Sequence, residues 1–153
     1  MKCWVEIESH LVEKQEEKRI RYDADYSRTD AGFSLIWEEQ EENNPVFINS
    51  FLKWDSKKQK MIVTRKGERE TELLFVPHEE TAFSIATDFG NFDGRIQTQQ
   101  INIAKNENSL FYCINIEYDL IFQDQAPQSN KMELFFGFLE EKCFFQESSR
   151  ILA

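Results

Sequence analysis

Residues 110–122, LFYCINIEYDLIF, decide the fold class of this chain. An apolar or aromatic side chain stands at every second position from Leu110 to Phe122, and the polar residues Asn115, Glu117 and Asp119 stand between them. In a β-strand successive side chains point to opposite faces, so a period of two is typical of a strand with one buried face. The stretch therefore predicts a long, half-buried β-strand.

The same alternation recurs along the chain and is interrupted by turn residues such as Asn43-Asn44-Pro45 and Gly90 to Gly94. No stretch shows the 3.6-residue apolar spacing of a helix, so every regular element is predicted to be a strand. The alternation and the turns give about ten strands, at residues 2–12, 18–27, 33–39, 46–54, 60–66, 70–76, 81–89, 95–104, 109–122 and 131–139. Short connections favour an up-and-down meander, and closing the sheet removes its edges. We expect one all-β domain at residues 1–140, an antiparallel up-and-down β-barrel of about eight to ten strands, followed by a C-terminal tail at 141–153.

Matching faces across the predicted turns gives an expected inner face. If the connections contain odd numbers of residues, one mostly apolar face continues over five strands. The residues assigned to it are Phe33, Leu35, Trp37, Phe47, Asn49, Phe51, Lys53, Met61, Val63, Arg65, Thr71, Leu73, Phe75, Phe83, Ile85, Thr87 and Phe89.

Composition excludes several classes of partner. The chain has 153 residues, 18 of them basic and 28 acidic, for a net charge of -10. Phosphate backbones and anionic membranes require a basic surface, so neither nucleic acid nor a membrane is expected as a partner. The N-terminal sequence MKCWVEIESH lacks the apolar region of a signal peptide. The chain has an odd number of cysteines, and they are far apart in the sequence: Cys3, Cys113 and Cys143. This pattern is typical of buried thiols in a reducing compartment. We therefore expect a cytoplasmic protein.

No recognisable catalytic constellation is present. The two histidines, His10 and His78, are far apart, and the sequence has no metal-binding CxxC or HExxH, no nucleophile elbow and no phosphate-binding loop. A cluster of glutamates at residues 38, 39, 41 and 42 is interpreted as a solvated loop rather than a cation site. We predict no catalytic residue, no metal and no cofactor, and hence no enzyme.

Five stretches, in this order, resemble a known family: FSLIWEE at residues 33–39, FLK at 51–53, IVTRKG at 62–67, FSIATDFG at 83–90 and INIEYDL at 114–120. The chain resembles the YwiB-like family, bacterial domains of unknown function with a calycin-like β-barrel. It departs from the family at Ile85, where a tyrosine is expected, and in a longer tail beyond Glu140. The resemblance implies a barrel shaped like those of lipocalins, and it implies no activity.

The first functional hypothesis is a binding barrel. A barrel of this size can hold one small ligand, and Arg65, Lys53 and Asn49 lie on the otherwise apolar predicted inner face. No acid lies on that face, since Glu38 and Glu117 fall on the opposite one. An inward cation without an acid requires a ligand anion or solvent at the barrel mouth. We therefore predict a small anionic amphiphile as ligand; its predicted contacts are Arg65, Lys53, Asn49, Trp37, Thr87 and Tyr118.

The alternative is a solid-core protein that acts through its outer surface. The stretch Met132–Leu139 is apolar on both faces, so both faces require a cover. Phe144 and Phe145 in the tail, or a second copy of the chain in a homodimer, are the two candidates for that cover. An enzyme of unrecognised chemistry is the third alternative, and no residue pattern supports it.

Overall fold

The computed structural model describes residues 1–11, 19–40, 46–106 and 111–138. Within these ranges every regular element is a β-strand. Compared with the prediction, ten strands are found, and their ends differ by only a few residues in most cases. They are β1 (Lys2–Leu11), β2 (Arg19–Arg28), β3 (Gly32–Gln40), β4 (Phe47–Asp55), β5 (Lys60–Lys66), β6 (Glu70–Phe75), β7 (Glu80–Thr87), β8 (Gly90–Asn106), β9 (Phe111–Phe122) and β10 (Gln128–Phe138).

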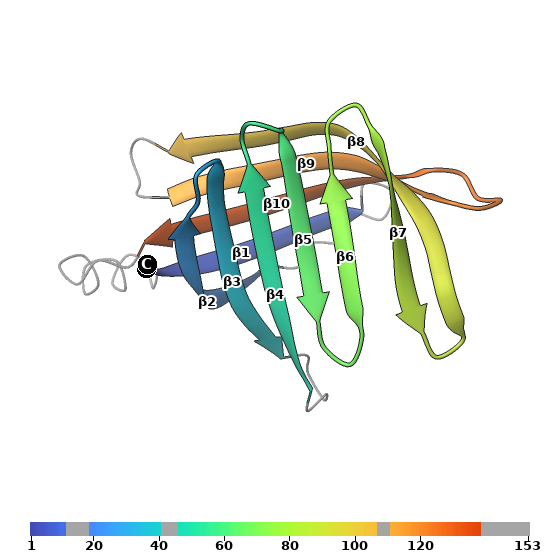
Figure 1. Ribbon diagram of the computed structural model, residues 1–153, viewed down its shortest axis with the longest axis horizontal. Coiled ribbons are helices and arrows are strands. Elements are labelled where there is room, and N and C mark those ends of the chain that lie inside the picture. The colour runs from blue at the N-terminus through green and yellow to red at the C-terminus, as the bar shows by residue number, and fades with distance from the viewer. Residues whose placement is uncertain (12–18, 41–45, 107–110, 139–153) are drawn as a thin grey trace.

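The strands form one antiparallel sheet in the order β6-β5-β4-β3-β2-β1-β10-β9-β8-β7. Every neighbour is also a neighbour in sequence except for β1 and β10, which pair from Cys3 opposite Phe138 to Leu11 opposite Asn130. The sheet wraps round so that its two halves cross and face each other (Figure 1). This arrangement confirms the predicted up-and-down β-barrel.

The interior is filled mainly by the alternate side chains that the sequence pattern places on one face. Phe136 is the centre of its aromatic part: its ring centroid lies 4.9 Å from that of Tyr112 and 5.2 Å from that of Phe33. The fully buried apolar side chains include Val5, Leu35, Leu52, Met61, Phe75, Ile96, Ile114, Ile116, Leu134 and Phe136. This core holds the inner surfaces of the two crossing layers together.

The predicted inner face of β4 is wrong. Phe33 pairs with Trp54 and Leu35 pairs with Leu52, so the even-numbered residues of β4 face inward. The reason is the connection between Gln40 and Phe47, which pair with each other across six intervening residues, an even number. A one-residue change in register moves every side chain of a strand to the other face.

The predicted inner faces of β5 and β6 are confirmed. Asp55 pairs with Lys60 across four residues, a second even connection, so the error at β4 cancels at β5. Met61, Val63 and Phe75 are buried accordingly. Phe89, by contrast, was predicted inside and is 95% exposed, because β7 ends at Thr87 and Phe89 lies in the turn that Gly90, with a φ of 113°, allows.

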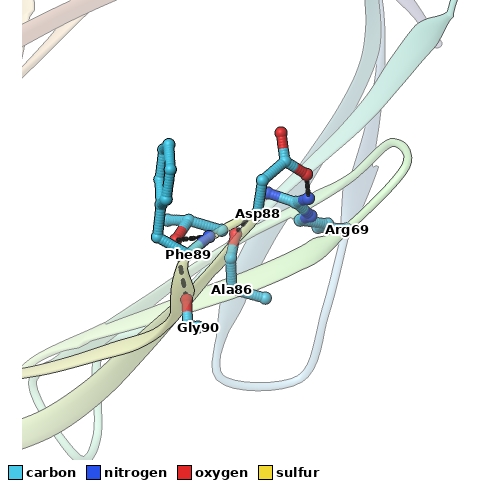
Figure 2. A network of polar contacts seen from close by, with 6 residues as sticks. Arg69, Ala86, Asp88, Phe89 and Gly90 are labelled. Carbon is cyan, nitrogen blue, oxygen red and sulfur yellow. Dashed lines mark hydrogen bonds and ion pairs between the residues drawn. The ribbon is translucent and has the colours of Figure 1, made fainter.

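The barrel is joined between β6 and β7 by side chains. In the described part of the chain no backbone hydrogen bond links these two strands. At one end of this seam the Thr81 hydroxyl donates to the Leu74 carbonyl at 2.5 Å. At the other end Arg69 donates to the Ala86 carbonyl at 3.1 Å and pairs with Asp88 (Figure 2). The β6–β7 seam is therefore the least cross-linked line of the barrel wall.

Candidate ligand-binding site

A cavity of about 380 Å³ lies inside the barrel. Residues of β1 to β6, β9 and β10 line it, so both crossing layers contribute to its wall. Most of this wall is apolar, including Ile7, Leu52, Val63, Leu73, Phe75 and Met132. The cavity thus offers a small molecule a mostly apolar environment.

Glu39 is the centre of the polar group at one end of this cavity. Its Oε2 accepts a hydrogen bond from Arg65 Nη2 at 2.7 Å and one from Ser50 Oγ at 3.3 Å, and its Oε1 accepts one from Trp37 Nε1 at 3.2 Å. Three donors on three different strands therefore hold one carboxylate in a fixed position, and charge-assisted bonds of this kind are stronger than neutral ones.

The ion pair lies at the mouth of the cavity. The side chain of Glu39 is 11% exposed and that of Arg65 is 48% exposed. Gln40 and Ile20, which also line the cavity, are exposed at the same rim. Arg65 can therefore contact solvent, Glu39 and the cavity at once.

Tyr22 is the third ionisable side chain at this end of the cavity, beside Glu39 and Arg65. Burial raises the pKa of its hydroxyl; the nearby charge of Glu39 raises it further, and that of Arg65 lowers it. The phenol is therefore neutral around pH 7 and can donate one hydrogen bond into the cavity.

Three of the predicted ligand contacts line the cavity, namely Trp37, Arg65 and Tyr118. Asn49 and Lys53 were predicted inside with them, and this orientation is wrong: both are exposed on the outer face of β4, as its register requires. Thr87 lies at the end of β7, where its hydroxyl donates to the Gly90 carbonyl at 2.7 Å.

Glu39 and Tyr22 are the site residues that the sequence reasoning missed. The expectation of an inner face without an acid is wrong, because Glu39 was assigned to an acidic loop. The alternation of Phe33, Leu35 and Trp37 continues to residue 39, and β3 extends to Gln40, so one more step of the period would have found it. No group of three His, Cys, Asp or Glu residues that could hold a metal ion occurs among the described residues.

A larger depression of about 660 Å³ lies where β7, β8 and β9 meet. Its charged lining residues, Asp93 and Arg95, are both exposed. We regard the smaller interior cavity as the better candidate of the two, because its buried polar groups converge with an apolar wall.

The two described cysteines are not activated. Burial raises the pKa of the Cys3 thiol to about 11, and burial also raises that of Cys113. A reactive cysteine requires the opposite shift. Cys143 and the predicted tail at 141–153 lie outside the described residues. No helix among the described residues is long and apolar enough to cross a membrane.

Fold and site together define a class: an all-β, up-and-down barrel with an internal, mostly apolar cavity and an ion pair at the mouth of that cavity. The chain belongs to the family described as "Domain of unknown function (DUF1934)", whose sequence profile matches residues 5–134. The match confirms the resemblance to YwiB-like domains.

One solved structure supports the fold. The crystal structure of the ywiB protein from Bacillus subtilis is similar to this chain with a TM-score of 0.69, at 18% sequence identity and with 91% of each chain covered. Likeness at this identity shows the fold alone. Comparison with curated proteins finds no match.

Proposed function

We propose that this protein binds one small amphiphilic molecule inside the barrel, with the polar head of the ligand beside Arg65. The observation that supports this proposal is the apolar cavity of about 380 Å³ ending at the Glu39–Arg65 pair. Its volume falls at the small end of the range typical of ligand pockets, roughly 300–1,000 Å³.

Glu39 changes the expected charge of the ligand. Arg65 already has a carboxylate partner at 2.7 Å, so the site is neutral as a whole without a bound anion. A second carboxylate at Arg65 would lie close to Glu39, and like charges at short distance repel. An uncharged head that both donates and accepts hydrogen bonds, such as a hydroxyl, fits the pair better than the anionic head that the sequence alone suggested.

The roles of the three residues at the mouth follow from their chemistry. Arg65 has five N–H donors, and the bond to Glu39 uses one of them, so others are free to bind an oxygen of the head group. Glu39 can accept from a ligand hydroxyl, and Tyr22 can donate to it. The apolar wall would hold the hydrocarbon part of the ligand by burial, which contributes roughly 25 cal/mol per Å².

The test is calorimetric titration with decanol and decanoic acid at pH 8. We expect saturable binding of decanol at a stoichiometry of one, and weaker binding of the carboxylate. Absence of saturable binding of both compounds would refute the interior site. Tighter binding of the carboxylate would refute the uncharged head and favour an anionic one.

Matched variants locate the site. The double variant Glu39→Gln/Arg65→Met removes both charges and so leaves no unpaired carboxylate; we expect it to bind decanol at least tenfold more weakly. Lys53→Met removes a cation from the outer face of the adjacent strand β4 and should leave binding unchanged. Equal binding by wild type and the double variant would show that the head group lies elsewhere.

We propose self-association as the second candidate function. An aromatic cluster on the outer face favours it: the ring of Phe111 lies 6.1 Å from that of Phe135 and 6.3 Å from that of Trp4. Light scattering at micromolar concentration tests this proposal. We expect the mass of a dimer for the wild type and of a monomer for Phe135→Lys, and a monomeric wild type would refute it.

A further inference from the structure

The hydroxyl of Thr98 is buried without a hydrogen-bond partner. The residue is 0% exposed, and its Oγ1 is one of two buried side-chain polar atoms among the described residues that lack a partner. Its backbone is held by the turn after β6: His78 N–H donates to the Thr98 carbonyl at 2.8 Å. A buried hydroxyl left without a partner is destabilising, so its presence requires an explanation.

The register of β8 aims this hydroxyl into the barrel. Thr98 lies two residues after the fully buried Ile96 and directly opposite Tyr118 of β9. The register shifts between Thr98 and Gln100, and this bulge lets the partly buried Ile101 and Ile103 return to the inner face. Opposite residues on one face have Cβ atoms about 5 Å apart. The Thr98 hydroxyl therefore lies beside the Tyr118 side chain, which lines the cavity.

The hydroxyl of Tyr118 also lacks a partner among the described residues, although Tyr118 itself is only partly buried. Its ring packs edge-on against Phe75 with centroids 5.0 Å apart. Burial raises the pKa of this hydroxyl above its ordinary value. Tyr118 and Thr98 are thus two neutral hydroxyls in an apolar environment, each able to donate and to accept.

These hydroxyls lie at the end of the cavity away from the Glu39–Arg65 pair. Arg65 pairs with Thr71, whereas Phe75, which contacts Tyr118, pairs with Met61. These two levels are four residues apart along β5 (65 against 61), which corresponds to about 13 Å at ~3.3 Å per residue. Phe75, Met61 and Thr98 are all 0% exposed and Tyr118 is partly buried, so this end is formed mostly by buried side chains.

We infer that Tyr118, with the Thr98 hydroxyl beside it, forms a second polar subsite at the end of the cavity away from the Glu39–Arg65 pair, which takes an uncharged hydroxyl or carbonyl at the far end of the ligand. The ligand class is then an elongated molecule that is polar at both ends and apolar between them. The deep group is uncharged, because the charged lining residues, Glu39 and Arg65, are both at the mouth. This inference rests on the proposed interior binding function and adds the chemistry of the ligand's second end.

The test compares decanol with the corresponding α,ω-diol by calorimetric titration. Burying a hydroxyl without a partner would weaken binding by about tenfold or more. If the subsite exists, the wild type should bind the diol within about threefold of decanol, because the deep hydroxyl finds partners. Thr98→Val and Tyr118→Phe, singly and together, should weaken diol binding by about tenfold and leave decanol binding within threefold.

Thr64→Val is the matched control. Thr64 is a buried threonine of β5, but it lies between Val63 and Arg65 and therefore on the outer face. This variant should bind decanol and the diol with the same ratio of affinities as the wild type. Thr98→Val should also leave the free protein at least as stable, since it replaces an unpaired hydroxyl by a methyl group of similar size.

Each negative outcome has a distinct meaning. If neither alcohol binds, the interior site itself fails, and the subsite with it. If decanol binds and the diol binds tenfold more weakly, the interior site stands and the subsite is wrong. Loss of stability in free Thr98→Val, with no change in the diol preference, would show that the hydroxyl holds a structural water only, which also overturns the subsite.

Discussion

Filling the cavity by Val63→Phe tests directly whether the interior is empty. Val63 lies in β5, pairs with Leu52 and Leu73, and points into the cavity that all three residues line. If the space of about 380 Å³ is free, the larger ring can enter it without displacing its neighbours. We expect this variant to be more stable than the wild type and to bind decanol at least tenfold more weakly.

The magnitude follows from the added surface. Phenylalanine has about four more carbons than valine, and each buried carbon contributes about 0.8 kcal/mol, which gives an upper limit of ~3 kcal/mol. The phenylalanine side chain loses rotamer freedom, and its ring contacts the cavity wall on one side only. These two effects reduce the gain to about 1 kcal/mol. For a chain of this size that corresponds to a rise in Tm of roughly 2–4 °C.

Val5→Phe is the matched control. Val5 is 0% exposed in β1, pairs with Tyr22 and Phe136, and does not line the cavity. The same substitution there overpacks a filled core, which costs about 1–3 kcal/mol. The two variants should therefore differ by about 2–4 kcal/mol in their free energies of unfolding.

The assay is urea denaturation followed by circular dichroism, with the slope of the transition compared among variants. An equal loss of stability in both variants would show that the interior at Val63 is as closely packed as that at Val5. In that case the reasoning that leads from the cavity to a bound ligand is wrong, and a solid barrel acting through its surface becomes the better hypothesis.

Three further predictions concern other parts of the molecule. Glu39→Gln should lower the free energy of unfolding by about 1–3 kcal/mol, because it weakens the charge-assisted bond from Arg65 at 2.7 Å; no change in the urea midpoint would contradict this. Arg69→Ala should cost under about 1 kcal/mol, since Asp88 is exposed, yet it should speed amide hydrogen exchange in the strands beside the seam; unchanged exchange would show that Arg69 does not restrain the seam. Burial, and to a smaller extent the charge of Asp25, raises the pKa of the Cys3 thiol from 9.0 to about 11. The stabilisation that the neutral thiol gives the folded protein is therefore complete below pH 9 and is lost as the pH rises towards 11. The stability difference between wild type and Cys3→Ala, measured by denaturation at several pH values, should therefore narrow across that range, and a constant difference would count against the shift.

The Glu39–Arg65 pair shows why a charge inside a barrel is tolerated. A buried carboxylate is costly unless it is paired and hydrogen-bonded. Glu39 meets both conditions through Arg65, Ser50 and Trp37, and Arg65 remains half in solvent. The pair is therefore stable without a ligand, and it still offers unused donors and acceptors at the mouth.

The sequence by itself determined the strands and their order. Alternation of apolar and polar residues has a local cause, the two faces of a pleated strand, so it identified all ten strands from composition and spacing alone. Short connections between strands then left the meander as the simplest topology. The apolar positions of β5 and β6 were assigned to the correct face, and with them Arg65, while Trp37 and Tyr118 were rightly named as residues of the interior.

Only the tertiary structure decided which face of β4 is inside and what lies beside Arg65. The face depends on whether a connection holds an odd or an even number of residues, and a change of one residue at a strand end leaves the local pattern almost unaltered while it inverts every side chain that follows. For this reason Asn49 and Lys53 were expected inside and lie outside, whereas Ser50 lies inside. Glu39 was hidden for a related reason: at the end of β3 an inward acid resembles the first residue of a charged loop. Trp37 is a partner from the same strand, but Ser50 and Arg65 come from β4 and β5. Only the paired registers bring these two residues to Glu39, and the sequence pattern of a single strand does not predict a contact with another strand.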